Sequence, residues 1–330
     1  MKTFDLMRPK KEYDVVTVQR EADGKKFYKK NKKKLVETTC PACNSEGIFA
    51  FSKFGFAHKV CPQCKTLFCS PRPSEDLLVN YYSEYNAPQL WTKLLQNADQ
   101  ERKVVQYIPR VNRIIDCIKG LNARPEMNAL DAGAGSGAFA ACLRKSGFFR
   151  EVTTLDIADS CVRACKEQGL IALKGTLADI PPCSFDLITL NDLIEHVYSP
   201  RNLLEQCHSA LRENGVIAIA TPNGEGFDFK ILREKTGNIT PPEHLNYFNP
   251  VSLSLLLKST GFLPVHVETP GLLDVDMVHK ARAGGFPLEK KNEYLGFILD
   301  HGDETRQEFQ KFISRCRLSS HMVIIAQKQR

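Results

Sequence analysis

The fold of this chain is decided by the stretch Met127-Asn-Ala-Leu-Asp-Ala-Gly-Ala-Gly-Ser-Gly-Ala-Phe-Ala-Ala-Cys-Leu-Arg-Lys145. Residues 128–131 are typical of the end of a short buried strand, and residues 138–145 have helical composition. The glycines between them can adopt positive φ and let a ligand approach the backbone. The helix that follows presents unpaired N–H groups. Because Asp131 would repel a phosphate, we expect a ligand with a cationic amino-acid group instead.

The spacing of these glycines is not that of a dinucleotide site. Such a site has Gly-x-Gly-x-x-Gly with the pyrophosphate at the helix start, whereas here the third glycine follows the second by only two positions. Two more acids follow at the ends of predicted strands. Asp156 comes 19 residues after Gly137, near where related folds place a carboxylate on ribose hydroxyls, and Asp179 follows later, within reach of an adenine amino group.

Asp131-x-Gly-x-Gly-x-Gly, with Asp156 and Asp179 downstream, resembles the S-adenosylmethionine (SAM) site of class I methyltransferases. The resemblance covers roughly residues 105–330. A structural turn in another doubly wound domain is the alternative. The resemblance implies a set of cofactor-binding residues, namely Asp131, Gly133, Gly135, Gly137, Asp156, Ile157, Asp179, Ile180 and Asn191.

Length and composition suggest about two domains and a sizeable core, since the chain has 330 residues and is 42% hydrophobic. No run of 18 apolar residues predicts a membrane span. The first residues lack the apolar core of a signal peptide. With twelve cysteines, we therefore expect a reducing cytoplasm, with free thiols or metal ligands.

The net charge of +7 is concentrated at the start of the chain. Residues 1–39 hold 12 Lys/Arg and 6 Asp/Glu, which leaves a net charge of only +1 for the rest. We interpret this segment as a solvated, partly disordered lead-in, with a small strand at Tyr13–Val18. A basic arm that binds nucleic acid or anionic lipid is the alternative.

Two Cys-x-x-Cys pairs follow, with 17 residues between them. This spacing is typical of a zinc ribbon, in which two knuckles place four thiolates around Zn²⁺. Four sulfurs close the coordination sphere, so the predicted metal is structural. Two redox pairs are the alternative, but such pairs usually open a helix in a thioredoxin-like context, which is absent here. The predicted ligands are Cys40, Cys43, Cys61 and Cys64.

The predicted class is α/β, a Rossmann-like doubly wound sheet with a terminal antiparallel strand, preceded by the small zinc ribbon. Its segments are the basic residues 1–39, the ribbon 40–73, a helical linker or cap 74–126, and the catalytic domain 127–330 with an insertion at 277–318. Strands are expected at 128–131, 152–156, 171–174, 185–190, 215–220, 263–268 and 320–327, and helices at 75–82, 88–120, 138–146, 159–168, 200–213 and 249–261.

The linker is rich in aromatic residues. A ribbon followed by Pro71-Arg-Pro73 and Tyr81-Tyr82 resembles the front end of bacterial methyltransferases of surface-sugar and secondary metabolism. We expect Tyr81, Tyr82, Tyr85 and Trp91 to pack between the ribbon and the catalytic domain, with a cover over the cofactor or a substrate contact as the alternative.

Candidate catalytic residues follow the central strand, where substrate-facing groups belong. Asp192, Glu195 and His196 have the spacing of one helical face, and His244 lies in a loop before a later helix. The set resembles that of metal-dependent methyltransferases acting on vicinal hydroxyls, the ubiquinone-pathway O-methylases and small-RNA 3′-end 2′-O-methylases, which tend to carry Glu at the first position. It implies Mg²⁺ as a further cofactor. The alternatives are that Glu195 and His196 only order the loop, and that His244 caps the helix near Pro250.

The sequence therefore predicts a SAM-dependent methyltransferase (EC 2.1.1.-) acting on a hydroxyl of a small polar acceptor, a sugar or nucleotide-sugar of glycan biosynthesis. His244, His196 and Glu195 are the predicted catalytic residues. RNA methylation, with the basic arm and ribbon holding RNA, is a second hypothesis, although the catalytic part lacks a basic footprint. A non-catalytic SAM-binding protein is the third, but it requires a defective glycine loop, and Asp131–Gly137 is intact.

Overall fold

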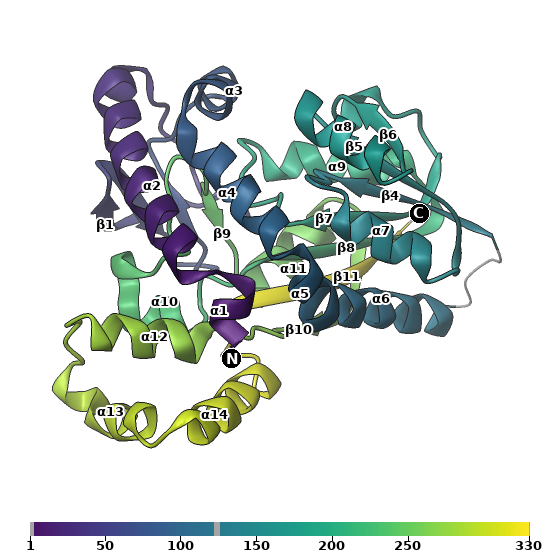
Figure 1. Cartoon of the computed structure of the whole chain (residues 1–330). Helices are drawn as coiled ribbons and strands as arrows, with labels where there is room; N and C mark the ends of the chain where they lie inside the picture. Colours follow the sequence, from purple (N-terminus) through teal and green to yellow (C-terminus); the bar gives the residue numbers. More distant parts are fainter. Residues whose placement is uncertain (1–2, 122–125, 330) are drawn as a thin grey trace.

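The structure, a computed structural model, describes residues 3–121 and 126–329 and is built around one large mixed sheet (Figure 1). Its strands lie in the order β10-β11-β8-β7-β4-β5-β6, and all neighbouring pairs are parallel except those that β11 makes. The predicted fold class, with its terminal antiparallel strand, is confirmed. The strands are β4 (Met127–Ala132), β5 (Phe149–Asp156), β6 (Ile171–Lys174), β7 (Phe185–Asn191), β8 (Leu211–Pro222), β10 (Phe262–Glu268) and β11 (His321–Lys328).

Helices cover both faces of this sheet (Figure 1). Successive side chains of a strand point to opposite faces, and β8 shows the consequence. Ile217 and Ile219 pack in the cluster that includes α9 and α11, whereas Val216 and Ala218 pack in the cluster that includes α6, α7 and α8. Both faces are therefore apolar, as a mainly parallel sheet requires. These helices are α6 (Ile108–Gly120), α7 (Ala138–Lys145), α8 (Asp159–Glu167), α9 (Pro200–Ala210) and α11 (Pro250–Ser259).

Two predicted helices have wrong boundaries. The helix expected over 200–213 ends at Ala210, because Leu211 pairs with Phe185 and begins β8. The helix expected over 88–120 is broken at Ala98 and contains a π-helical turn, a feature that often marks functional sites. Its pieces are α4 (Asn86–Asn97), α5 (Asp99–Arg102), the π-helical turn (Lys103–Tyr107) and α6, and α3 (Glu75–Glu84) precedes them.

The four-cysteine ribbon forms a second, antiparallel sheet that also contains a strand of the catalytic half. Its order is β1-β2-β3-β9. Leu67 of β3 pairs with Tyr247 of β9, and Phe68 pairs with Asn246. The ribbon is therefore joined by backbone hydrogen bonds to the loop that carries His244. The strands are β1 (Ile48–Lys53), β2 (Phe56–Val60), β3 (Leu67–Cys69) and β9 (Asn246–Tyr247).

The basic N-terminal segment is a helix, and the predictions of a partly disordered lead-in and of a strand at Tyr13–Val18 are wrong. Helices α1 (Thr3–Met7) and α2 (Lys10–Asn31), with a 3₁₀ turn at Lys32–Lys34, run along the outside of the ribbon and α4 (Figure 1). Although α2 is rich in lysine, one of its faces is buried. Arg20, Asp23 and Phe27 recur at helical spacing and are all buried.

The buried face of α2 binds the rest of the chain through specific partners. Arg20 forms an ion pair with Glu243 at 2.7 Å, and the Asp23 carboxylate accepts the backbone N–H of Ala87 at 2.9 Å. Phe27 packs with Tyr81 and with two further aromatic residues, Tyr85 and Phe56. Part of the aromatic linker thus packs against the ribbon, as expected, while Tyr82 and Trp91 face a cavity.

A helical subdomain lies at the bottom of Figure 1; three of its helices come between β10 and β11 in the sequence, and its remaining helix comes between β8 and β9. The three helices overlap the segment 277–318 that was predicted as an insertion, although the first of them already begins at Asp274. Leu232, Val275, Leu299 and Ile313 form its core. None of the helices in the described part of the chain combines the length and apolarity needed to cross a membrane. The subdomain comprises α10 (Phe227–Leu232), a turn at Arg233–Lys235, α12 (Asp274–Ala283), a turn at Lys290–Asn292, α13 (Glu293–Asp300) and α14 (Asp303–Arg315).

We predict that Arg20→Ala lowers the free energy of unfolding by about 3–5 kcal/mol, because it leaves the buried Glu243 carboxylate without its cation. Urea titration followed by circular dichroism measures this. The double variant Arg20→Met with Glu243→Gln is the control and should recover most of the loss. A single variant as stable as the parent protein would show that the pair does not hold α2 in place.

Candidate active site

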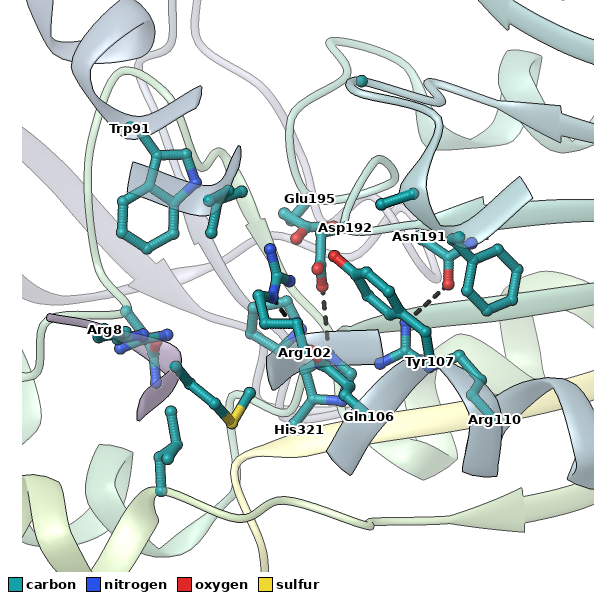
Figure 2. Close-up of a pocket in the computed structure, with 18 of the residues that line it drawn as sticks. Arg8, Trp91, Arg102, Gln106, Tyr107, Arg110, Asn191, Asp192, Glu195 and His321 are labelled. Atoms are coloured by element: carbon teal, nitrogen blue, oxygen red, sulfur yellow. Dashed lines mark hydrogen bonds and ion pairs between the residues drawn. The ribbon is translucent and has the colours of Figure 1, made fainter. Parts of the chain in front are cut away.

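A cavity of about 490 Å³ lies at the carboxyl ends of β4 and β7, where open α/β sheets bind ligands (Figure 2). One end is formed by the glycine loop after β4. The turn after β7 and the loop before β9 form one side, and α1, α2, α4 and the π-helical turn form the other. The cavity thus brings together the cofactor loop and the predicted catalytic residues.

The glycine loop has the backbone that its sequence predicts. All three glycines have positive φ, at +70°, +54° and +81°. Gly133 and Gly135 line the cavity, and a Cβ built at Gly135 would meet no described atom within 4 Å. At Gly137, directly before α7, a Cβ would lie 2.9 Å from the sulfur of Cys165 in α8. A glycine is therefore needed here for the start of α7 to pack closely against α8. The open space therefore lies beside the first two glycines.

Asp131 is fully buried at the end of β4 and faces Asn191. Its carboxylate accepts hydrogen bonds from Thr189 at 2.6 Å and from the Asn191 amide at 3.1 Å. Arg110 in turn donates to the Asn191 oxygen at 2.6 Å. Burial raises the pKa of Asp131 to about 6. No cation of the described residues forms an ion pair with Asp131, and a buried carboxylate of this kind is suited to a cationic ligand group.

Asp156 lies on the other side of the glycine loop. It accepts the backbone N–H of Gly135 at 3.0 Å and that of Ala158 at 2.9 Å, which fixes its carboxylate beside the open position. Burial raises its pKa despite these bonds. Ile157, which follows it, is 57% exposed and presents an apolar surface at the strand end.

Asp179 is exposed, and its carboxylate forms hydrogen bonds within its own turn. It accepts hydrogen bonds from the backbone N–H of Thr176 at 2.8 Å and from its hydroxyl at 3.1 Å, and these bonds lower its pKa. Ile180 is buried in the core. Neither Asp156 nor Asp179 lines the cavity. A ligand that spanned all three acids would therefore place only one end in the cavity.

Glu195, His196 and His244 converge on one point. One ligand atom from each lies within 4.8 Å of the others. Glu195 is fully buried. One of its oxygens accepts the Thr221 hydroxyl at 2.8 Å, while the other has no hydrogen-bond partner among the described residues. Burial raises its pKa well above the usual range. An orphaned buried oxygen of this kind is the place for a bound cation or a donor group.

Both imidazoles are oriented by backbone carbonyls. The Nδ1 of His196 lies 2.9 Å from the carbonyl oxygen of Glu243, and the Nδ1 of His244 lies 2.9 Å from that of Asn238. Because a carbonyl oxygen only accepts, each Nδ1 carries the proton and each Nε2 keeps a free electron pair. Burial lowers the pKa of both rings, so both are neutral. The Tyr82 oxygen also lies 2.8 Å from His196 Nδ1.

Asp192 does not join this group, and the predicted helical face is wrong. Residues 192–196 form a turn, which begins with a positive φ of 51° at Asp192. The Asp192 carboxylate pairs with His321 at 3.1 Å (Figure 2). The alternative role for His244, capping the helix near Pro250, is also excluded. Asn249 caps α11, because its side-chain oxygen accepts the backbone N–H of Ser252 at 2.9 Å.

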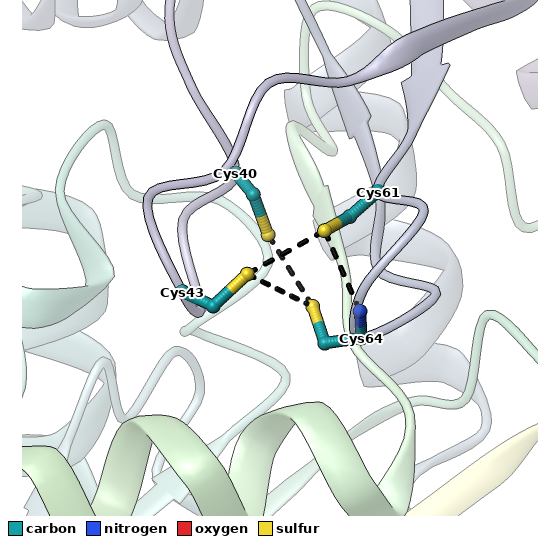
Figure 3. Close-up of side chains that lie close together, drawn as sticks. All are labelled: Cys40, Cys43, Cys61 and Cys64. Carbon is teal, nitrogen blue, oxygen red and sulfur yellow. Dashed lines mark hydrogen bonds between the residues drawn. The ribbon is translucent and has the colours of Figure 1, made fainter.

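The four predicted metal-binding cysteines form a compact cluster (Figure 3). Their sulfurs lie 3.4–3.6 Å apart in three pairs, close to the roughly 3.8 Å expected for a tetrahedral Zn²⁺ site with 2.3 Å bonds. The Asn249 amide donates to the Cys64 carbonyl at 2.9 Å, so the cluster contacts the start of α11. His58 packs away from it, with its Nδ1 3.2 Å from the carbonyl of Phe56.

Several residues of the site were not identified from the sequence. Tyr82 and Glu243 hold His196, Asn238 holds His244, and Arg8 and Arg102 line the cavity. Apart from Asn238, which lies six residues before His244, they come from segments distant in sequence from the residues they meet. Tyr82 was named from the sequence only as a residue of the aromatic linker, without its contact to His196.

Comparison with known proteins agrees with this geometry. A family model described as a methyltransferase domain matches residues 92–267. The mitochondrial ubiquinone biosynthesis O-methyltransferase of Saccharomyces cerevisiae is 30% identical over 112 residues, which cover 31% of this chain and 36% of that protein. A Mycobacterium tuberculosis protein named as a probable S-adenosylmethionine-dependent methyltransferase is 27% identical over 165 residues, 46% of this chain and 56% of that protein. The chain thus spans between about a third and a half of these relatives.

A solved structure shows the shared fold. A chain in the complex between the Haloferax volcanii Trm112 methyltransferase activator and a methyltransferase superposes with a TM-score of 0.50 and 12% identity, over 73% of this chain and 96% of that one. The family model covers more than half of the 330 residues. The chain therefore belongs to the methyltransferase domain family.

Proposed function

We propose that this chain is a SAM-dependent methyltransferase that methylates a hydroxyl of a small polar acceptor, such as a sugar or nucleotide-sugar. One observation carries the proposal. The intact glycine loop, with Asp131 and Asp156 beside it, opens into the same cavity as Glu195, His196 and His244. Membership of the methyltransferase domain family supports it.

In this proposal, the methionine end of SAM lies against Gly133 and Gly135, with its ammonium near Asp131 and Asn191. Asp156 accepts both ribose hydroxyls, and Asp179 with Ile157 and Ile180 receives the adenine. Asp179 would first have to release its bonds to Thr176. The methyl group then points into the cavity, because only the residues of the methionine end line it.

The transfer step is a displacement in which the acceptor oxygen attacks the methyl carbon, the carbon–sulfur bond breaks, and the sulfonium becomes a neutral thioether. The acceptor hydroxyl must also lose its proton. His244 is suited to receive it, because its Nδ1–H is held by Asn238 and its Nε2 electron pair is free. The cavity supplies the alignment that an in-line displacement needs.

The same three side chains also fit a divalent ion. Two Nε2 electron pairs and the orphaned Glu195 oxygen would hold it, and both Nδ1–H···O=C bonds are of the kind that orient metal-binding histidines. A set with two imidazoles suits Mn²⁺ or another transition metal better than Mg²⁺, which prefers oxygen ligands. When bound, such an ion would lower the pKa of the acceptor hydroxyl.

We further propose that Cys40, Cys43, Cys61 and Cys64 hold a structural zinc ion. The folded N-terminal segment favours a small acceptor over RNA, because its buried face packs on the catalytic half and its Arg8 and Arg20 line the cavity. The second hypothesis, RNA held by a basic arm, would have to use the exposed lysines of α2, such as Lys25, Lys26 and Lys29, and not its buried face.

Asp156→Ala should weaken binding of S-adenosylhomocysteine by about 1.5–3 kcal/mol, because two ligand hydroxyls lose a charged acceptor. Isothermal titration calorimetry measures this. Asp159→Ala, which removes an exposed carboxylate three residues later, is the matched control and should leave the affinity unchanged. Equal affinities for the Asp156 variant and the parent protein would remove Asp156 from this role.

His244→Ala should keep its fold and its S-adenosylhomocysteine affinity but lose about 10²–10⁴-fold in turnover of a hydroxylated acceptor identified by screening, the usual range for a general base. His301→Ala, at an exposed site, is the control. Binding of Mn²⁺ followed by electron paramagnetic resonance separates the two chemical roles, since a ligand role predicts that the variant no longer binds the ion. Full turnover in His244→Ala would end both assignments.

Metal analysis of the purified chain should find one zinc ion per molecule. Replacing Cys61 and Cys64 together by serine should remove it, because two thiolates cannot complete the tetrahedral site. The control is Cys316→Ser, which changes an exposed cysteine outside the cluster. Retention of the full zinc content by the double variant would assign the metal to other residues.

A further inference from the structure

The cavity has an outer end that the cofactor proposal leaves free. Met7 and Arg8 at the end of α1, Trp91 of α4 and Met277 of α12 line this end, away from the glycine loop. Because Asp156 and Asp179 lie outside the cavity, the bulk of SAM would also lie outside it. The space beyond the methyl group is therefore available to an acceptor, and its side chains indicate what that acceptor carries.

Five arginines line the cavity, and three of them have clear partners: Arg20 pairs with Glu243 at 2.7 Å, Arg113 pairs with Glu268 at 2.6 Å, and Arg110 donates to Asn191 at 2.6 Å. The other two are Arg8 and Arg102. Within the described residues, neither forms an ion pair with a carboxylate. Arg8 and Arg102 are therefore without a carboxylate in direct contact, although Arg102 lies close enough to Asp99 and Asp192 for its charge to favour the ionised form of both carboxyls.

Arg102 is only 7% exposed, although its one hydrogen bond is from Nε to the Gln106 side chain, at 3.3 Å. Its guanidinium also lies 5.0 Å from the centre of the Tyr107 ring. An aromatic ring attracts a cation but does not neutralise it. Burying a charge without a counter-ion is costly, so this arrangement is expected where a ligand supplies the counter-ion.

Arg8 is held in a different way, by aromatic rings. Its guanidinium carbon lies 5.4 Å from the centre of the Tyr13 ring, 5.6 Å from that of Trp91 and 5.9 Å from that of Phe4. Among the described residues, its one side-chain hydrogen bond is a long contact of 3.9 Å to the Met277 sulfur. The rings fix the side chain, and its other N–H donors have no acceptor within residues 3–121 and 126–329.

The two arginines come from neighbouring elements. Arg8 directly follows α1, Arg102 ends α5, and these two helices contact each other. Figure 2 shows both side chains in the cavity that also contains Asp192 and Glu195. The two carboxylates on which the charge of Arg102 acts make their direct contacts with other groups: Asp192 pairs with His321, and Asp99 accepts the Ser136 hydroxyl at 3.1 Å.

We propose that Arg8 and Arg102 bind a phosphate group of the acceptor, which makes the substrate a phosphate ester or a diphosphate. This inference rests on the proposed methyltransferase function and specifies its substrate class. Guanidinium groups match the paired oxygens of a phosphate with two parallel N–H···O bonds. The phosphate would supply the missing counter-ion for both cations and hold the acceptor hydroxyl toward His244.

The test uses the single tryptophan of the chain, Trp91, which contacts Arg8 and Arg20. Inorganic pyrophosphate is titrated, at constant ionic strength, into the full-length protein loaded with S-adenosylhomocysteine, and the tryptophan fluorescence is recorded. The parent protein should give a saturable change. Arg8→Met and Arg102→Met should each weaken pyrophosphate binding at least tenfold, whereas Arg163→Met, at an exposed site on α8, should not. Arg8→Lys keeps the positive charge but loses the paired N–H donors of the guanidinium. Its affinity for pyrophosphate should lie between those of the parent protein and Arg8→Met.

A second arm identifies the anion that Arg102 binds, because the methionine carboxylate of SAM has the same chemistry. The affinities of Arg102→Met for S-adenosylhomocysteine and for 5′-methylthioadenosine, which lacks the amino-acid portion, are compared. The proposal predicts that neither changes. Loss of S-adenosylhomocysteine affinity alone, with pyrophosphate binding intact, would assign Arg102 to the cofactor and overturn the proposed pair.

The proposal is also wrong if the parent protein shows no saturable pyrophosphate binding, or if Arg8→Met binds it as the parent does while keeping the parent's melting temperature. Binding of S-adenosylhomocysteine is measured on the same samples. Its absence from the parent protein would contradict the methyltransferase function itself, so the two failures are distinguishable.

Discussion

The site depends on the backbone hydrogen bonds of one residue, Leu245, in the loop between His244 and β9. Its carbonyl accepts the N–H of Cys69 at the end of the ribbon, at 2.9 Å, and its own N–H donates to the carbonyl of Glu195 at 2.8 Å. The adjacent pairing of β3 with β9 continues this ladder. The four-cysteine ribbon is thereby connected, through the backbone of Leu245, to Glu195. A module with so little core of its own depends on a metal to fold, so the proposed zinc would also hold the loop that carries His244.

The N-terminal helix fixes the same loop from the other side. Glu243 binds Arg20 of α2 through its side chain and His196 through its carbonyl oxygen. The orientation of the His196 ring therefore depends on a helix more than 170 residues away in the sequence. Basic composition alone does not reveal this, because the helix exposes its lysines and buries a narrow face. The N-terminal helix thus helps to orient a side chain of the cavity to which we assign a catalytic role only as a proposal.

How much could be predicted from the sequence depended on whether the signal was local. The glycine loop, the order of strands and helices, and the cysteine pairs are written in contiguous residues with fixed spacing, and all are confirmed. Asp192 was placed wrongly because a turn with positive φ replaced the expected helix. The partners of the imidazoles, Glu243 and Asn238, could not be predicted. They accept through their backbone carbonyl oxygens, which every residue has, so the sequence does not distinguish them.

The backbone hydrogen bonds of Leu245 imply that the ribbon and the loop that carries His244 form one cooperative unit. Hydrogen exchange of the backbone amides, measured by mass spectrometry with and without the ribbon zinc, tests it most directly. If zinc is bound there as proposed, its removal should speed exchange in residues 244–249 as much as in 40–69, while β4 and β7 stay protected. Exchange that rises in 40–69 alone, with 244–249 as protected as before, would contradict it.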